Sequence, residues 1–141
     1  MRRYLLDTSL VAGLLNDRPG AVALVRPWME RHEAATSILA FAEVIEYIKP
    51  RSDFDQRQTA LRSILKEVYP YFLTYRILER YADIRSQLRS PRGPGLIGDI
   101  DTLIAATALE RNLTLATTDG DFERVPGLKI TLVPRADLRR R

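Results

Sequence analysis

The stretch GDIDTLIAATALERNLTLATTD, residues 98–119, decides the fold because it joins an apolar helix to a short buried strand. Its spacing predicts a helix over 99–111 and a strand over 113–117. Asp99 and Asp101 stand at the front of the helix, where carboxylates either help to start it or carry chemistry. Side chains two residues apart on a helix point to different sides, so we do not expect both aspartates to serve one ion.

The same alternation of short apolar strands and helices runs through the rest of the chain. Strands are predicted at 4–6, 34–36, 69–75, 113–117 and 129–133. Helices are predicted over 10–16, 19–31, 38–48, 54–68, 77–90 and 99–111. The loop PRGPGLIG, 91–98, breaks both patterns with its glycines and prolines. This order predicts a parallel sheet that helices cover on both faces.

Single residues predict details of two of these helices. Ser37 and Asp53 are the expected N-caps, because their side-chain oxygens can accept from the first free backbone N–H groups. In the helix that follows Ser37, the expected apolar stripe consists of Leu39, Ala42, Ile45 and Ile48, with Ala40, Val44 and Tyr47 near it.

Composition limits the class of protein and the kind of metal site. The chain has 141 residues, enough for one domain, and its 22 basic and 18 acidic side chains give a net charge of +4, which permits a nucleic-acid partner. There is no cysteine and a single histidine, His32, so a bound metal is expected to be a hard cation with oxygen ligands. No apolar run reaches membrane-spanning length, and we expect a cytoplasmic protein.

Four acids are expected to converge where the parallel strands end. Asp7 closes the first strand, and Asp119 follows the strand over 113–117. Glu43 lies near the middle of the helix after the second strand, on its second turn, and Asp101 lies in the first turn of the helix over 99–111. Ligands of open parallel sheets bind outside the carboxyl ends of the strands. Carboxylates gathered there favour a divalent cation, and such a cation on a basic domain suggests phosphodiester hydrolysis. Helix capping and turn formation remain the alternative reading for each acid taken alone.

The chain resembles the PIN-domain ribonucleases, specifically the VapC toxins of VapBC type II toxin–antitoxin systems. The resemblance lies in four segments: YLLDTSL (4–10), ATSILAFAEV (35–44), DIDTLIAATALERNLTLATTDGDFERVPGL (99–128) and KITLV (129–133). It implies an α/β fold, a PIN-like three-layer α/β/α sandwich with a short central parallel sheet. It also implies that residues 1–141 form a single PIN domain.

The resemblance assigns metal binding and catalysis to four acids and supporting contacts to their neighbours. The catalytic and metal-binding set is Asp7, Glu43, Asp101 and Asp119. The supporting set is Thr8, Ser9, Asp99, Thr117 and Asp121, with Asp99 expected to be either the helix N-cap or a support for the acids. The implied cofactor is magnesium (Mg²⁺), with manganese (Mn²⁺) as a substitute.

The implied function is a metal-dependent endoribonuclease toxin that acts on RNA, forms a homodimer, binds a VapB-type antitoxin and has no membrane partner. Arg18, Arg89 and Arg92 are candidates for an RNA path, and the loop over 91–98 is longer and richer in proline than the family pattern. The alternatives are a housekeeping PIN-type RNA-processing nuclease, a toprim-like phosphoryl-transfer domain and a non-enzymatic binding module. A toprim domain has a glutamate after its first strand, where this chain has Asp7.

Overall fold

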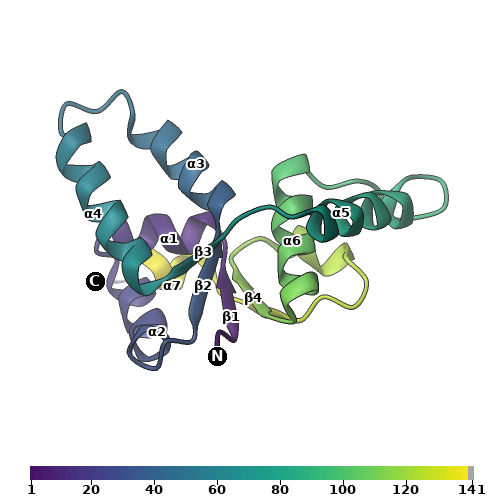
Figure 1. The fold of residues 1–141 in the computed structure, drawn as a ribbon, viewed down its shortest axis with the longest axis horizontal. Helices are drawn as coiled ribbons and strands as arrows, with labels where there is room; N and C mark the ends of the chain where they lie inside the picture. Colours follow the sequence, from purple (N-terminus) through teal and green to yellow (C-terminus); the bar gives the residue numbers. More distant parts are fainter. Residues whose placement is uncertain (140–141) are drawn as a thin grey trace.

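A five-stranded parallel sheet lies at the centre of residues 1–139, the part of the chain that the computed structural model describes (Figure 1). The strands are β1 (Tyr4–Leu6), β2 (Ala34–Ser37), β3 (Tyr69–Tyr71), β4 (Thr114–Thr117) and β5 (Ile130–Leu132). Their order in the sheet is β3-β2-β1-β4-β5, and every neighbouring pair is parallel. The carboxyl ends of all five therefore lie along one edge, with β1 in the middle.

Helices cover both faces of this sheet, as the sequence predicts. They are α1 (Thr8–Leu15), α2 (Pro19–Glu30), α3 (Ile38–Ile48), α4 (Phe54–Glu67), α5 (Tyr75–Leu88), α6 (Asp99–Arg111) and α7 (Arg135–Arg139), with a 3₁₀ helix η1 (Gly120–Arg124). In Figure 1, α1 to α4 and α7 lie on one side of the sheet, and α5 and α6 lie on the other. The predicted three-layer α/β/α sandwich is confirmed.

Adjacent residues of each strand face opposite helical layers. Leu5 of β1 packs with the α5–α6 layer, whereas Leu6 packs with the layer of α1 to α4. Ala34 and Ala116 share the face of Leu6, and all four of these side chains are fully buried. A strand buried on both faces favours apolar residues at consecutive positions, which explains the short continuous apolar runs in the sequence.

The buried stripe of α3 differs in part from the predicted one, because Ile48 is buried as predicted but its partners are Ala40 and Val44, which were expected beside the stripe. The buried residues are Ala40, Val44 and Ile48, whereas Ala42 is exposed. Both sets satisfy helical spacing, so periodicity cannot decide between them. The side of α3 that packs against the sheet is the buried one, and the sequence of the helix alone does not show which side that is.

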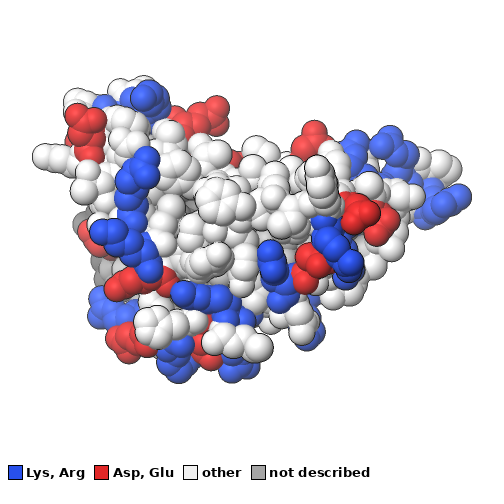
Figure 2. Space-filling view, viewed as in Figure 1, with Lys and Arg blue, Asp and Glu red and all other residues white. Residues whose placement is uncertain are grey.

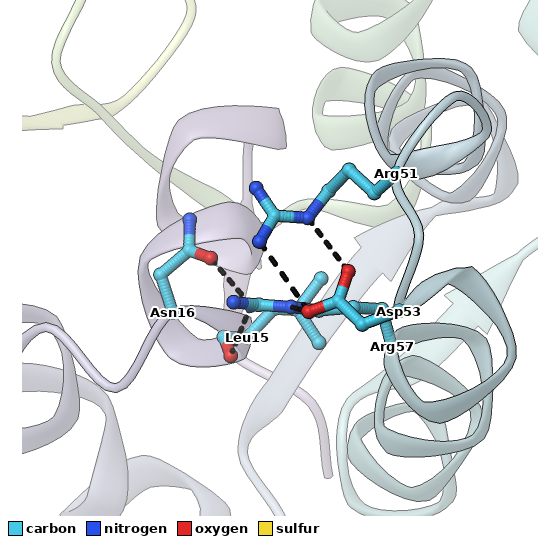
Figure 3. A network of polar contacts seen from close by, with 5 residues as sticks. All are labelled: Leu15, Asn16, Arg51, Asp53 and Arg57. Atoms are coloured by element: carbon cyan, nitrogen blue, oxygen red, sulfur yellow. Dashed lines mark hydrogen bonds and ion pairs between the residues drawn. The ribbon is translucent and has the colours of Figure 1, made fainter.

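Asp53 precedes α4, but its side chain does not cap that helix, which corrects the capping prediction. The carboxylate instead accepts from Arg51 Nε at 2.9 Å and Arg57 Nε at 3.2 Å (Figure 3). Arg57 Nη1 also donates to Asn16 Oδ1 at 2.7 Å and to the carbonyl of Leu15 at 3.4 Å. Two charged partners at close range replace the weaker capping bond, and the network ties the start of α4 to the end of α1.

Within residues 1–139, no helix is long and apolar enough to cross a membrane.

Candidate active site

Asp7 lies at the carboxyl end of β1, in the middle of the sheet edge, and only 6% of it is exposed. One carboxylate oxygen accepts from the backbone N–H of Leu10 at 3.3 Å, which caps α1, and from Ser9 Oγ at 2.6 Å. The other oxygen accepts from the hydroxyl of Thr117. Burial raises the pKa of Asp7, and the hydrogen bonds from Ser9 and Thr117 oppose that rise. Capping and site formation are therefore combined in one residue.

Thr117 joins Asp7 to the turn that carries Asp119. Its hydroxyl donates to Asp7 Oδ2 and accepts from the backbone N–H of Asp119 at 3.0 Å. Asp119 in turn accepts from the backbone N–H of Asp121 at 2.9 Å and caps η1. Thr117, the last residue of β4, thus holds the backbone of Asp119 and also contacts Asp7 at the end of the neighbouring strand β1.

Thr8 and Ser9 contact different acids, although they are adjacent in α1. Ser9 donates to Asp7, and the hydroxyl of Thr8 donates to Glu43 Oε1. Glu43 lies on the second turn of α3 and is half-buried. Since α1 and α3 start from neighbouring strands, the Thr8 contact brings the acid of the second strand's helix to the same edge as Asp7.

Asp101 lies in the first turn of α6 and is half-buried. Burial and the negative charges of Asp119, Glu43 and Asp7 raise the pKa of Asp101 from 3.8 to about 6. Among the side chains that the structure describes, none donates a hydrogen bond to the carboxylate of Asp101 or forms an ion pair with it. The structure therefore brings the four predicted acids within electrostatic range of one another, and we call this group (Asp7, Glu43, Asp101, Asp119) the carboxylate edge.

The N-cap prediction for Asp99 is wrong, and none of its hydrogen bonds within the described residues goes to an acid of the carboxylate edge. The N-cap of α6 is Gly98. The carboxylate of Asp99 accepts from Tyr81 Oη at 3.1 Å and from Arg85 Nη1 at 2.7 Å, so it faces α5. A charged partner across the interface between the helices is worth more to this exposed carboxylate than a cap. Tyr81 and Arg85 are four residues apart and therefore lie on one face of their helix. This spacing can be seen in the sequence, but it does not show that Asp99 is their common partner.

Asp121 is more exposed than the acids of the carboxylate edge. Its side chain is 57% exposed and forms an ion pair with Arg124 at 3.5 Å. Its negative charge nevertheless contributes to the raised pKa of Asp101. It therefore lies at the rim of the carboxylate edge, where its own charge is partly neutralised.

The donor chemistry of the carboxylate edge fits a hard divalent cation. In the region that the structure describes, no three of the acids are placed to hold a metal ion as they stand. All the available ligands are oxygens, which Mg²⁺ and Mn²⁺ prefer, and nitrogen and sulfur ligands are lacking there. Burial and repulsion by the neighbouring acids together raise the pKa of Asp101, and a bound cation would offset both effects.

Thr117→Val is expected to lower the free energy of unfolding by about 1–3 kcal/mol, because buried Asp7 and the Asp119 N–H each lose a partner. Urea unfolding measures this change. Thr107→Val is the matched control, since Thr107 is equally buried but donates only to the carbonyl of Leu103 in its own helix. Equal losses in the two variants would contradict the bridging function of Thr117.

The sequence matches one family model over most of its length, residues 4–128, and that model describes the PIN domain. The chain belongs to the PIN domain family. The match includes all four acids of the carboxylate edge and ends before β5.

Known proteins similar to this PIN domain share its length as well as its fold. Ribonuclease VapC1 of Haemophilus influenzae (strain R2866) is 26% identical over 128 residues, which are 89% of this chain and 94% of that protein. The structure of VapBC2 from Rickettsia felis bound to a DNA fragment from their promoter aligns with a TM-score of 0.81 and 23% identity, over 92% of this chain and 98% of that chain. A toxin–antitoxin complex from Klebsiella pneumoniae aligns with a TM-score of 0.70 and 23% identity, over 91% and 95% of the two chains.

Proposed function

We propose that this PIN domain is a divalent-metal-dependent endoribonuclease toxin of the VapC type. The observation that carries the proposal is the carboxylate edge, where burial and the charges of acids from different elements raise the pKa of Asp101 to about 6. Membership of the PIN domain family and similarity to a protein named Ribonuclease VapC1 support RNA as the substrate. Similarity to a toxin–antitoxin complex supports a VapB-type antitoxin as the partner, and we expect a homodimer as the active form.

The proposed mechanism divides the work between the acids and the hydroxyl groups beside them. The carboxylate edge would hold Mg²⁺, or Mn²⁺ in its place, and the metal would polarise a phosphoryl oxygen and activate a water molecule. Ser9 and Thr117 hold both oxygens of Asp7, and Thr8 holds one oxygen of Glu43, so these carboxylates are fixed before any ligand binds. Asp101 accepts no such bond in the described region, and its charge is free to meet the cation.

Removal of the metal is expected to abolish cleavage of RNA by the purified protein. The assay follows a fluorescently labelled single-stranded RNA pool with excess chelator and then with Mg²⁺ added back, and we expect cleavage only in the second condition. Glu43→Gln, purified in the same way, controls for contaminating nucleases because it removes one charge of the carboxylate edge and keeps the side-chain shape. Cleavage that persists in chelator, or that Glu43→Gln does not reduce, would overturn the proposed function.

A further inference from the structure

A hollow of about 530 Å³, open to solvent, lies at the carboxyl end of α5. We call it the arginine pocket and define it by six of its lining residues: Tyr81, Arg85, Ser86, Arg89, Ser90 and Arg92. Figure 2 shows basic side chains over this end of α5 and the loop that follows, at the right of the view. All six residues can donate hydrogen bonds, and three of them are permanently charged.

The positive charge of the arginine pocket is largely unneutralised. In the part of the chain that the structure describes, neither Arg89 nor Arg92 forms an ion pair with a carboxylate, and both side chains are exposed. The opposite end of α5 differs, because Arg76 and Arg80 both pair with Glu110, at 3.3 Å and 3.1 Å. Charge therefore accumulates at one end of α5, which suits an anionic ligand.

The loop after α5 folds back on the helix and holds the pocket in shape. Gly95 N donates to the carbonyl of Leu88 at 2.7 Å, and Gly93 N donates to the carbonyl of Arg89 at 2.9 Å. A Cβ atom at Gly93 would lie 2.0 Å from the carbonyl oxygen of Gln87, so only glycine allows this approach. The return of the loop brings Arg92 to the same hollow as Arg89.

The arginine pocket is attached to the carboxylate edge through the first turn of α6. Asp99 holds Arg85 and Tyr81 of the pocket, and Asp101, two residues later, belongs to the edge. With a rise of about 1.5 Å per residue, the backbones of these two aspartates are only a few ångströms apart along the helix. The pocket and the carboxylate edge are therefore linked through neighbouring residues of one helix.

The carboxylate edge and the arginine pocket carry opposite charges, so they act differently on a polyanion. The carboxylate edge repels the phosphates that flank a scissile bond, since a cation there serves mainly the reacting phosphate. An enzyme with such an edge needs positive groups nearby to hold the rest of the strand. Arginine forks bind phosphate oxygens in pairs, and serine hydroxyls can add further donors.

We propose that the arginine pocket is a phosphate subsite, in which Arg89 and Arg92 bind the backbone of the RNA strand that is cut at the carboxylate edge. The subsite rests on the proposed function for its substrate. It acts on binding, because the contacts are made equally in the bound substrate and in the transition state. It reads no bases, since the contacts are to phosphates.

The test compares the double variant Arg89→Gln/Arg92→Gln with the native protein in cleavage of a single-stranded RNA with Mg²⁺. We expect KM to rise about tenfold and kcat to stay within about twofold. In binding assays on the Glu43→Gln background, the slope of log affinity against log salt should fall by about 0.7 for each phosphate that the variant no longer neutralises. The matched control is Arg76→Gln/Arg80→Gln, which removes the same charge from the same helix at its other end; its KM should change far less.

Gly93→Ala separates the shape of the pocket from its charge. This variant keeps every arginine but forces the loop away from the end of α5, so we expect KM to rise although the charge is unchanged. Thermal unfolding of each variant shows whether the fold is retained. A KM for Gly93→Ala equal to the native value would contradict a built subsite and would leave only general charge attraction.

The outcomes distinguish this proposal from the proposed function. If the native protein cleaves RNA with Mg²⁺ and Arg89→Gln/Arg92→Gln changes KM no more than the control, the subsite is wrong and the nuclease stands. If the native protein cleaves no RNA, both are wrong. If the double variant keeps its RNA affinity but loses affinity for a poly-glutamate peptide, the pocket serves an acidic protein segment and the RNA subsite is overturned.

Discussion

Asp101→Asn is expected to lower the rate of RNA cleavage by about 100-fold or more while making the metal-free protein more stable at pH 7. The charge of the Asp101 carboxylate underlies both the loss of cleavage and the gain in stability. In the proposed mechanism the carboxylate holds the metal, so its loss removes catalysis. In the folded protein without metal the same charge is repelled by Asp119, Glu43 and Asp7.

The pH dependence of stability follows from the raised pKa of Asp101. Its carboxyl has a pKa of about 6 in the folded protein against 3.8 ordinarily, so between these values the folded chain holds a proton that the unfolded chain has released. The contribution of Asp101 to the free energy of unfolding therefore falls as pH rises from about 4 to about 6. Asp101→Asn cannot titrate and should flatten this part of the curve.

Urea unfolding in chelator at a series of pH values measures the change in stability. The RNA cleavage assay measures the loss of catalysis in Asp101→Asn. Mg²⁺ should stabilise the native protein at pH 7, less so at pH 5, and should leave Asp101→Asn nearly unchanged. Asp83→Asn is the control, because Asp83 is an exposed acid on α5. A metal-free Asp101→Asn that is less stable than the native protein at pH 7 would show that the acids do not repel one another as inferred.

Phe122→Ala is expected to lower the free energy of unfolding by about 3–5 kcal/mol. Phe122 is the largest of the fully buried side chains, with 1% exposed, and it packs in the core layer that contains Ile104, Leu115 and Val125. Its removal leaves a cavity and also detaches η1, the short helix that Asp119 caps. The variant should therefore lose activity beyond the fraction that is unfolded.

Urea unfolding checks the size of this effect against two controls. Phe122→Leu keeps most of the buried volume and should cost about 1–1.5 kcal/mol. Phe72→Ala removes the same atoms from a side chain that is 65% exposed and should change stability by less than about 0.5 kcal/mol. A cost below about 1 kcal/mol for Phe122→Ala would mean that η1 is not anchored by this ring.

Features that are local in the chain were predictable from the sequence. The strand over 113–117 and the helix over 99–111 follow from apolar runs and helical spacing, and both exist with nearly the expected bounds. Asp7 follows β1 directly and Asp119 comes two residues after the end of β4, so the rule for parallel sheets was enough to expect them at one edge. Membership of the PIN domain family removes the toprim-like alternative.

Features that depend on a partner from another element were not predictable. Nothing near Asp99 in the sequence shows that Arg85 will lie across from it, and nothing near Asp53 shows that Arg57 will also reach Asn16. Asp99 pairs with an arginine of another helix, whereas Asp53 pairs with its sequence neighbours Arg51 and Arg57, and it is the contact of Arg57 with Asn16 that depends on packing. Local rules give the residues that can cap, and tertiary packing decides which of them do.

The first turn of α6 places two acids back to back on one rigid element. Asp99 supports the arginine pocket on one side, and Asp101 belongs to the carboxylate edge on the other. A helical turn does not stretch, so Asp99 and Asp101 keep the same spacing when ligands bind. If a phosphate is held in the pocket, the bond that is cut lies at a set number of nucleotides from it. The backbone of α6 would then act as a ruler that measures RNA by length instead of by sequence.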